Sequence, residues 1–472
     1  MKILFLNPPP VSKYGNTRTM GAMGSNKIDY CWQPIDLLIL SGYLRQEGFD
    51  NDVIDANAEK MSDSSLLKLL NQKQYDFIVC STGISTIDTD MAIINKIKKA
   101  LPKTLIAAIG TFVMSNYSWV LQNCKGLDIA IYSEPEEVCL NIVKHFSTWY
   151  EVKGIAFRTS EVEVNEPEKI VIDINKFGLP AHDKVKPELY YSAIGKTKPM
   201  AMIMPQRGCV NRCTFCCMPA FWKPYRARSP DSVVKEILWL KELGYNEYMF
   251  NDAEMNGHVK WSMELFQKII DAKIDMPWTG LLRARDVPEE LIRLMKESGC
   301  YSLALGVESI DEKIIKAVKK NYTLEELRFS VNVCKKYKID ILLFVIYGLN
   351  GETKETMKAT FDEVKRLNPD YATFGIAVPT PGTPFYDYIN ENNFWVSNDI
   401  KEKWELYDPM KAPLYNYPNL SSKEMWDFSR YSLKKFYASP QHLFQRISKI
   451  RDFEDFKRFI KNGMEFTKRY LL

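Results

Sequence analysis

Short apolar runs alternate with segments of helical period along most of the chain, and this alternation occurs in two series. In the first series, five apolar runs predict strands at residues 3–7, 52–55, 76–80, 105–110 and 128–132. Strands separated by helices pair in parallel and bury both faces of their sheet. Residues 1–150 are therefore predicted to form an α/β domain with a doubly wound parallel sheet.

Small polar residues follow several of these strands. They are Asn7, Pro8, Ser81, Thr82, Gly83, Gly110, Ser133 and Glu134. Ligands of such sheets bind outside the carboxyl ends of the strands, where Gly and Ser allow close approach of the backbone. The pattern is typical of a binding site and also of ordinary turns, and the residues alone leave both interpretations open.

The second series begins near residue 200, after a predicted connector at 151–195 with a hairpin between 154–158 and 169–173. Its six apolar runs predict strands at 202–204, 247–250, 278–280, 302–305, 341–346 and 371–374. Six strand–helix units in a row predict an incomplete parallel barrel over residues 196–390. In such barrels the chemistry lies at the carboxyl ends of the strands.

Three cysteines follow the first strand of this barrel. Cys209, Cys213 and Cys216 are spaced by four and three residues, and Cys217 follows directly. Three thiolates on a four-iron cluster leave one iron without a protein ligand, whereas an electron-transfer cluster needs four. A structural zinc site also needs a fourth ligand, for which Cys217 is poorly placed and no His is near. The spacing therefore favours a substrate-binding iron–sulfur cluster.

Around these cysteines the chain resembles the radical S-adenosylmethionine (SAM) superfamily, and in particular its cobalamin-binding branch. The similarity rests on the motif Cys209-x₃-Cys213-x₂-Cys216 and on flanking segments. These segments are Arg207-Gly208, Arg226-Ala-Arg228-Ser-Pro, Gly306-Val-Glu308-Ser309, Gly348-Leu-Asn-Gly351 and Pro379-Thr-Pro-Gly-Thr-Pro384. The first domain, beginning Asn7-Pro8-Pro9, resembles the cobalamin-binding domain of that branch.

The resemblance implies three cofactors, namely a [4Fe–4S] cluster, SAM and cobalamin. It places Phe215 near the adenine of SAM, Asp252 and Glu254 near its amine or ribose, Arg283 at its carboxylate, and Glu308 at the ribose or beside Arg283. A structural ion pair is the alternative for each charged residue. Cobalamin would be held by the strand-end loops without a histidine, because no Asp-x-His-x-x-Gly motif is present and the first His is His145.

The resemblance implies an enzyme that cleaves SAM reductively and activates an unreactive carbon. Chain length and the tail suggest members that modify membrane lipids, so carbon–carbon bond or ring formation on a lipid is the first expectation and C-methylation the second. An RNA-modifying or zinc-binding protein is a third. An external electron donor of the flavodoxin or ferredoxin type is implied.

Residues 391–472 form a basic, aromatic tail, with ten Lys/Arg against four Asp/Glu over 431–472. Phe453, Phe456 and Phe459 recur at intervals of three, and Phe444, Phe466 and Tyr470 add to the stripe. Such a tail is typical of helices that cover a barrel, or of a basic amphipathic surface that contacts a membrane. The scattered remaining cysteines indicate a reducing, cytoplasmic compartment, and a net charge of +4 gives no indication of nucleic-acid binding.

Overall fold

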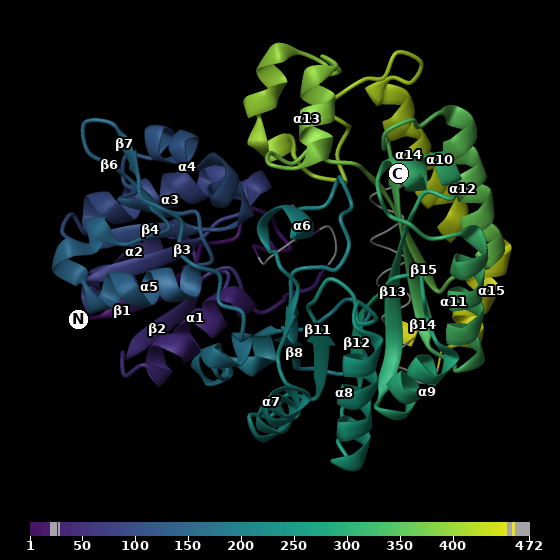
Figure 1. Ribbon diagram of the computed structural model, residues 1–472, viewed down its shortest axis with the longest axis horizontal. Helices are drawn as coiled ribbons and strands as arrows, with labels where there is room; N and C mark the ends of the chain where they lie inside the picture. The colour runs from purple at the N-terminus through teal and green to yellow at the C-terminus, as the bar shows by residue number, and fades with distance from the viewer. Residues whose placement is uncertain (19–25, 27–28, 451–455, 458–472) are drawn as a thin grey trace.

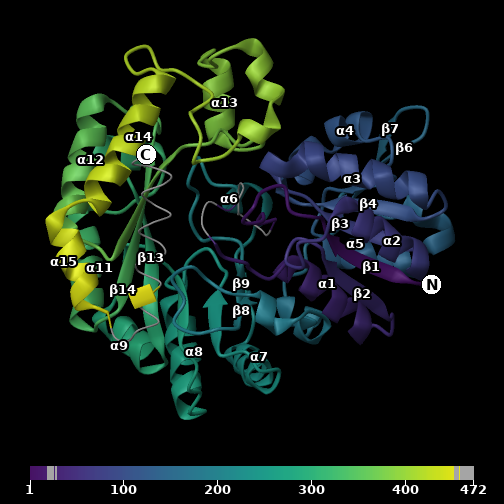
Figure 2. The ribbon, with the colours of Figure 1, turned by 180° about the vertical axis from the view of Figure 1, so that it is seen from behind.

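The computed structural model describes residues 1–18, 26, 29–450 and 456–457. Two separate sheets, each flanked by helices, lie on either side of the short helix α6 (Met218–Phe221), as Figure 1 shows. The view from behind in Figure 2 shows the same two lobes, with the yellow C-terminal helices on the outer side of the second one.

The first sheet has seven strands in the order β2-β1-β3-β4-β5-β6-β7. The first five in the chain pair in parallel, and they are β1 (Ile3–Asn7), β2 (Asn51–Asp55), β3 (Phe77–Ser81), β4 (Leu105–Ile109) and β5 (Ile129–Ile131). The helices are α1 (Ile35–Gln46), α2 (Asp63–Lys73), α3 (Ile87–Ala100), α4 (Thr111–Asn123) and α5 (Pro135–Lys144). The predicted doubly wound sheet is confirmed, and its strand order reverses between β1 and β3.

One part of the predicted connector belongs to this sheet. Strand β6 (Ile155–Arg158) pairs antiparallel with β5, and β7 (Val162–Val164) pairs antiparallel with β6. The predicted hairpin partner 169–173 is wrong, because the chain turns back at once after β6. The sheet thus continues beyond residue 150.

The second sheet is fully parallel, in the order β15-β14-β13-β12-β11-β8. Its strands are β8 (Met200–Ile203), β11 (Glu247–Phe250), β12 (Trp278–Leu282), β13 (Cys300–Glu308), β14 (Asp340–Tyr347) and β15 (Tyr371–Ile376). The outer helices are α7 (Pro230–Glu242), α8 (Val259–Asp271), α9 (Glu289–Glu297), α10 (Glu312–Ala317), α11 (Leu324–Lys336) and α12 (Lys354–Leu367). Thr323 caps α11 as predicted, through a reciprocal capping box with Glu326. The six-unit partial barrel is confirmed.

Buried contacts join the two lobes next to the first barrel strand. The amide of Gln33 accepts a hydrogen bond from the backbone N–H of Met202 at 2.8 Å and donates one to the Tyr245 hydroxyl at 2.7 Å. The segment around Ala181 crosses α1, where the Ala181 N–H donates to the Leu38 carbonyl at 2.8 Å. These contacts hold the carboxyl end of the first sheet beside the barrel.

The C-terminal region contains α13 (Pro384–Glu391), α14 (Ser422–Tyr437) and α15 (Pro440–Ser448). Helix α14 packs along β15, and its Ser429 hydroxyl donates to the Phe374 carbonyl at 2.6 Å. Trp404, between α13 and α14, packs against Phe112 of α4, with ring centroids 4.7 Å apart. Helix α14 therefore covers the barrel, as one of the two interpretations of the tail predicted. The segment between α13 and α14 reaches the first lobe through Trp404.

The aromatic stripe of the tail is only partly described. Phe444 is 77% exposed and Phe456 is also exposed, whereas Phe453, Phe459, Phe466 and Tyr470 lie outside the described residues. None of the described helices combines the length and the apolar character that a membrane-spanning helix requires. The membrane contact expected from the tail stays a prediction.

Gly42 in α1 offers a test of the contact between the first lobe and the connector. A Cβ at this position would lie 2.1 Å from the Leu179 carbonyl oxygen. Gly42→Ala should therefore reduce the free energy of unfolding by about 3 kcal/mol, at the upper end of overpacking costs. Gly48→Ala is the control, because a Cβ there meets nothing within 4 Å and only the positive φ of 89° is unfavourable. Equal losses of melting temperature in the two variants would contradict this account.

Candidate active site

The loop that carries the cysteines is closed by a two-stranded ladder. Strands β9 (Gln206–Arg207) and β10 (Arg226–Ala227) pair antiparallel, with Arg207 opposite Arg226. The intervening segment follows β8, so it lies at the carboxyl end of the barrel as predicted. The cysteine loop also contacts the barrel at the end of α10, since the Thr214 N–H donates to the Val318 carbonyl at 3.1 Å.

The three cysteines of the motif differ in exposure, since Cys213 is buried whereas Cys209 and Cys216 are partly exposed. The Cys209 Sγ lies 3.6 Å from the Glu254 Oε1, and the Cys213 Sγ lies 3.8 Å from the Lys319 carbonyl oxygen. Burial raises the pKa of Cys209 to about 12 and raises that of Cys213 as well. A hydrogen bond with Cys217 is the main cause of the raised pKa of Cys216. Within the described ranges, no three His, Cys, Asp or Glu side chains form a ready single-ion site.

Four predicted charged residues converge on the same end of the barrel. Asp252 and Glu254 follow β11, Arg283 follows β12, and Glu308 ends β13. All four are buried, and the Arg283 Nη1 lies 3.9 Å from the Glu254 Oε2. Phe215 is partly buried and packs against the barrel core. The structure thus brings together four charged residues separated by up to 56 positions in the sequence.

Several polar atoms in this group lack a hydrogen-bond partner in the described part of the chain. They are both carboxylate oxygens of Asp252, the Nε and Nη2 of Arg283, and the Oε2 of Glu308. Buried polar groups are nearly always hydrogen-bonded, and unsatisfied ones are costly. A ligand with a carboxylate for Arg283 and a cationic amine or hydroxyl groups for the two acids would satisfy them.

Glu308 and Lys320 form an ion pair that sequence reasoning missed. The Lys320 Nζ lies 2.8 Å from the Glu308 Oε1, and both side chains are largely buried. Glu308 has a φ of 58°, and the register between β13 and β14 shifts beside it. Residues in sparsely populated backbone regions cluster at functional sites. Lys320 lies in a loop after α10 and belongs to no motif, so no sequence signal pointed to it.

A cavity lies at the carboxyl end of the first sheet, with about 570 Å³ of empty space that includes open solvent. Of the predicted loop residues, those that line it are Ser81, Thr82, Gly83, Gly110 and Ser133. The others do not line it, since Asn7 and Pro8 contact Arg18, and Glu134 contacts Arg207 and Arg226. The backbone at Gly110 packs closely against the backbone at Thr82, because a Cβ on Gly110 would lie 2.5 Å from the Thr82 carbonyl oxygen.

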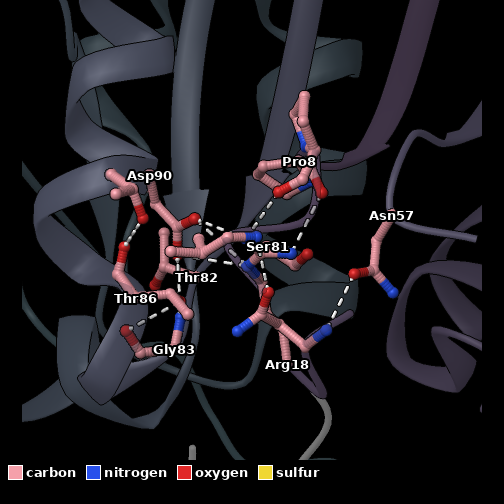
Figure 3. Close-up of polar contacts among 12 residues, drawn as sticks. Pro8, Arg18, Asn57, Ser81, Thr82, Gly83, Thr86 and Asp90 are labelled. Carbon is pink, nitrogen blue, oxygen red and sulfur yellow. Dashed lines mark hydrogen bonds and ion pairs between the residues drawn. The ribbon is translucent and has the colours of Figure 1, made fainter. Parts of the chain in front are cut away.

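Arg18 is the main residue of this cavity that sequence reasoning missed. Its guanidinium forms a buried ion pair with Asp90 at 2.8 Å and donates to the Pro8 carbonyl at 3.0 Å, as Figure 3 shows. Asp90 also accepts hydrogen bonds from the Thr86 hydroxyl at 2.7 Å and the Gly83 N–H at 3.2 Å. The network fixes the loops after β1 and β3 on either side of the point where the strand order reverses.

Two family models match the chain. The model described as the radical SAM superfamily matches residues 203–364, and the model described as a B12 binding domain matches residues 23–143. The first spans the cysteine loop and most of the partial barrel, and the second spans most of the parallel strands of the first lobe, where the cavity lies.

Among similar proteins, an uncharacterized methyltransferase, PH0819 of Pyrococcus horikoshii, is 28% identical over 454 residues, covering 95% of this chain and 95% of its own. The anaerobic magnesium-protoporphyrin IX monomethyl ester cyclase of Rubrivivax gelatinosus is 25% identical, covering 98% of this chain and 83% of its own.

Two solved structures share the fold. The cobalamin-dependent SAM radical enzyme OxsB, with aqua-cobalamin and SAM bound, superposes with a TM-score of 0.73 at 15% identity over 99% of this chain and 71% of its own. The radical SAM methyltransferase TsrM of Kitasatospora setae, with cobalamin and a [4Fe–4S] cluster bound, gives a TM-score of 0.68 at 18% identity over 83% and 75%.

The unpartnered carboxyl of Asp252 has a consequence for stability. Burial raises its pKa to about 8 from an ordinary value of 3.8, and the charge of Glu254 adds to the rise. Because the folded pKa lies above the unfolded one, this group destabilises the ligand-free protein increasingly as pH rises from about 4 to about 8. Asp252→Asn should therefore raise the melting temperature, more at pH 8 than at pH 5.

The control for this prediction is Asp275→Asn, which removes an exposed carboxyl in the loop before β12. Melting curves of the ligand-free proteins at pH 5 and pH 8 provide the measurement. A gain for Asp252→Asn that is the same at both pH values, or matched by the control, would show that the buried carboxyl does not carry this cost.

Proposed function

We propose that this chain, which is a cobalamin-dependent radical SAM enzyme, transfers a methyl group to an unactivated carbon of a small-molecule substrate. The radical SAM domain implies a [4Fe–4S] cluster and SAM, and the B12-binding domain implies cobalamin. Enzymes of this class also need a reductant. Membership of this class does not by itself specify methyl transfer or the methyl acceptor, and these two are what we propose.

The observation that carries the proposal is that the cysteine loop contributes a residue to the cavity of the first lobe. Trp222 lines the cavity of the first lobe, although it belongs to the loop that carries Cys209, Cys213 and Cys216. Methyl transfer from cobalamin to a carbon activated by SAM chemistry requires both cofactors to act on one substrate. Reactive groups must be held in near-attack geometry, so adjacent cofactor sites favour this reaction.

The donor sets of the two sites fit these groups. Cys209, Cys213 and Cys216 would hold the cluster, and the unpartnered atoms of Asp252, Arg283 and Glu308 match the amine, carboxylate and ribose of SAM. Gly83 and Gly110 in the lining of the cavity would allow a bound group to approach the backbone closely. When bound, the cluster and SAM supply radical chemistry, and cobalamin supplies the methyl group. The protein orients these groups and excludes water.

Ring or carbon–carbon bond formation is the second candidate, supported by the similarity to the magnesium-protoporphyrin ester cyclases. A membrane-lipid substrate, the first expectation from the sequence, has less support. Helix α14 packs on the barrel, and most of the aromatic stripe lies outside the described residues. The lipid substrate therefore stays a prediction, which lipid profiles of a deletion strain would test.

Anaerobic turnover of the reconstituted enzyme with reductant, SAM and cobalamin separates the two reactions. Methyl transfer predicts both 5′-deoxyadenosine and S-adenosylhomocysteine by mass spectrometry, because a second SAM is needed to restore the methyl donor. 5′-Deoxyadenosine with no S-adenosylhomocysteine would contradict methylation and favour ring formation. A cobalamin-free incubation is the control.

The cysteine assignment is tested by a matched pair of variants. Cys213→Ala should abolish 5′-deoxyadenosine formation and reduce the iron and acid-labile sulfide retained after reconstitution, because a cluster ligand is lost. Cys217→Ala removes a neighbouring buried thiol outside the motif and should retain the cluster. Purified protein that contained zinc and no acid-labile sulfide, or Cys213→Ala protein that retained activity, would overturn the assignment.

A further inference from the structure

Trp222 belongs to the cysteine loop and also lines the cavity of the first lobe. Its side chain is 6% exposed and lines the cavity of the first lobe. Its indole N–H has no hydrogen-bond partner among the residues that the structure describes. A buried N–H is a donor that costs free energy when unsatisfied, so a partner in the cavity would be favourable. Trp222 therefore borders the cavity and carries a buried N–H donor without a partner among the described residues.

The backbone of Trp222 is fixed to the start of the cysteine loop. A Cβ on Gly208, the residue before Cys209, would lie 2.1 Å from the Trp222 carbonyl oxygen. Gly208 has a φ of 81°, which favours glycine. The two ends of the loop thus pack directly against each other, and the placement of Trp222 depends on the conformation of the loop.

Arg207 connects the same loop to another residue that lines the cavity, Glu136. Its guanidinium carbon lies 5.3 Å from the centroid of the Trp222 ring. Its Nη1 and Nη2 donate to the two carboxylate oxygens of Glu136 at 3.0 and 2.6 Å. Glu136 lies in the first turn of α5 and also lines the cavity. Planar bidentate pairs of this kind fix orientation as well as position.

We infer that Trp222 is a cobalamin-binding residue supplied by the cysteine loop, and that it links cobalamin affinity to occupancy of the cluster site. This inference rests on the proposed function only in taking cobalamin as the occupant of the cavity. Cys209 and Cys216, which would bind the cluster, lie between Arg207 and Trp222 in the sequence. A bound cluster would therefore restrict the conformation of the loop that positions Arg207 and Trp222. Trp222 donates its indole N–H to a carbonyl oxygen of the bound cobalamin, such as that of an amide side chain.

Linkage between two sites is reciprocal, with typical coupling of about 5- to 150-fold in affinity. Hydroxocobalamin should therefore bind the cluster-loaded chain at least about 5-fold more tightly than the cluster-free chain. Conversely, bound hydroxocobalamin should slow the release of cluster iron to a chelator. Both measurements use the full-length wild-type protein, and absorbance reports the bound cobalamin and the released iron.

Trp222→Phe tests the residue itself. Loss of one neutral hydrogen bond should weaken hydroxocobalamin binding to the cluster-loaded protein about 3- to 10-fold, and the difference between loaded and cluster-free protein should shrink. Trp149→Phe is the matched control. Trp149 lies in the first lobe, as the cavity does, but it packs on Phe157 and does not line the cavity. It should bind hydroxocobalamin as the wild type does.

The outcomes distinguish this inference from the proposed function. Equal hydroxocobalamin affinity in loaded and cluster-free wild-type protein, or in wild type and Trp222→Phe, would overturn the inference and leave methyl transfer standing. No binding in either form would overturn both. If Trp222→Phe failed to fold, the two wild-type measurements would still decide whether the sites are linked. Linkage without methyl transfer in turnover would support the inference and contradict the proposed function.

Discussion

Two buried arginines hold the cysteine loop against the first lobe, and the arrangement of both candidate sites depends on them. Arg207 and Arg226 are paired across the ladder that closes the cysteine loop, and both donate to Glu134 at the start of α5. Burial opposes ionisation of Glu134, but its pKa is lowered because the hydrogen bond from Arg226 and the charges of both arginines outweigh that effect. Removing one member of such a buried group leaves an uncompensated charge, which costs about 3–5 kcal/mol.

In the candidate active site, unlike at Glu134, the cost of burying charged groups is only partly offset by partners among the described residues. At the carboxyl end of the barrel, Asp252, Arg283 and Glu308 are buried with several polar atoms unpartnered among the described residues. Such groups destabilise the ligand-free protein, and a ligand that paired with them would supply the compensating interactions. The site is therefore preorganised, because its polar groups are oriented by the barrel before the ligand arrives. The clamp of arginines and the well-packed barrel core stabilise a fold that contains this unfavourable cluster.

The sequence allowed much of this architecture to be predicted, because strand and helix periodicity are local properties. Each of the eleven strands predicted in the two series overlaps an observed strand, and the cysteine spacing pointed to the loop after β8 as the candidate cluster site. The hairpin partner of β6 was misplaced because 162–164 and 169–173 have similar local patterns, and pairing is decided by the turn. Arg18 was missed because its partner Asp90 lies 72 positions away in the sequence. Lys320 and Trp222 were missed because neither belongs to a motif that the sequence analysis used.

The sequence by itself determined the class of this protein. A three-cysteine motif after a barrel strand specifies the cluster chemistry, and alternating apolar runs specify two parallel sheets, because both signals reside in short segments. Only the tertiary structure decided how the two sites relate. Trp222 of the cysteine loop lines the cavity of the other lobe, and Arg207 reaches Glu136 across the same boundary. Such contacts depend on how the lobes pack, and the buried ion pairs that set this packing join residues about 70 to 90 positions apart.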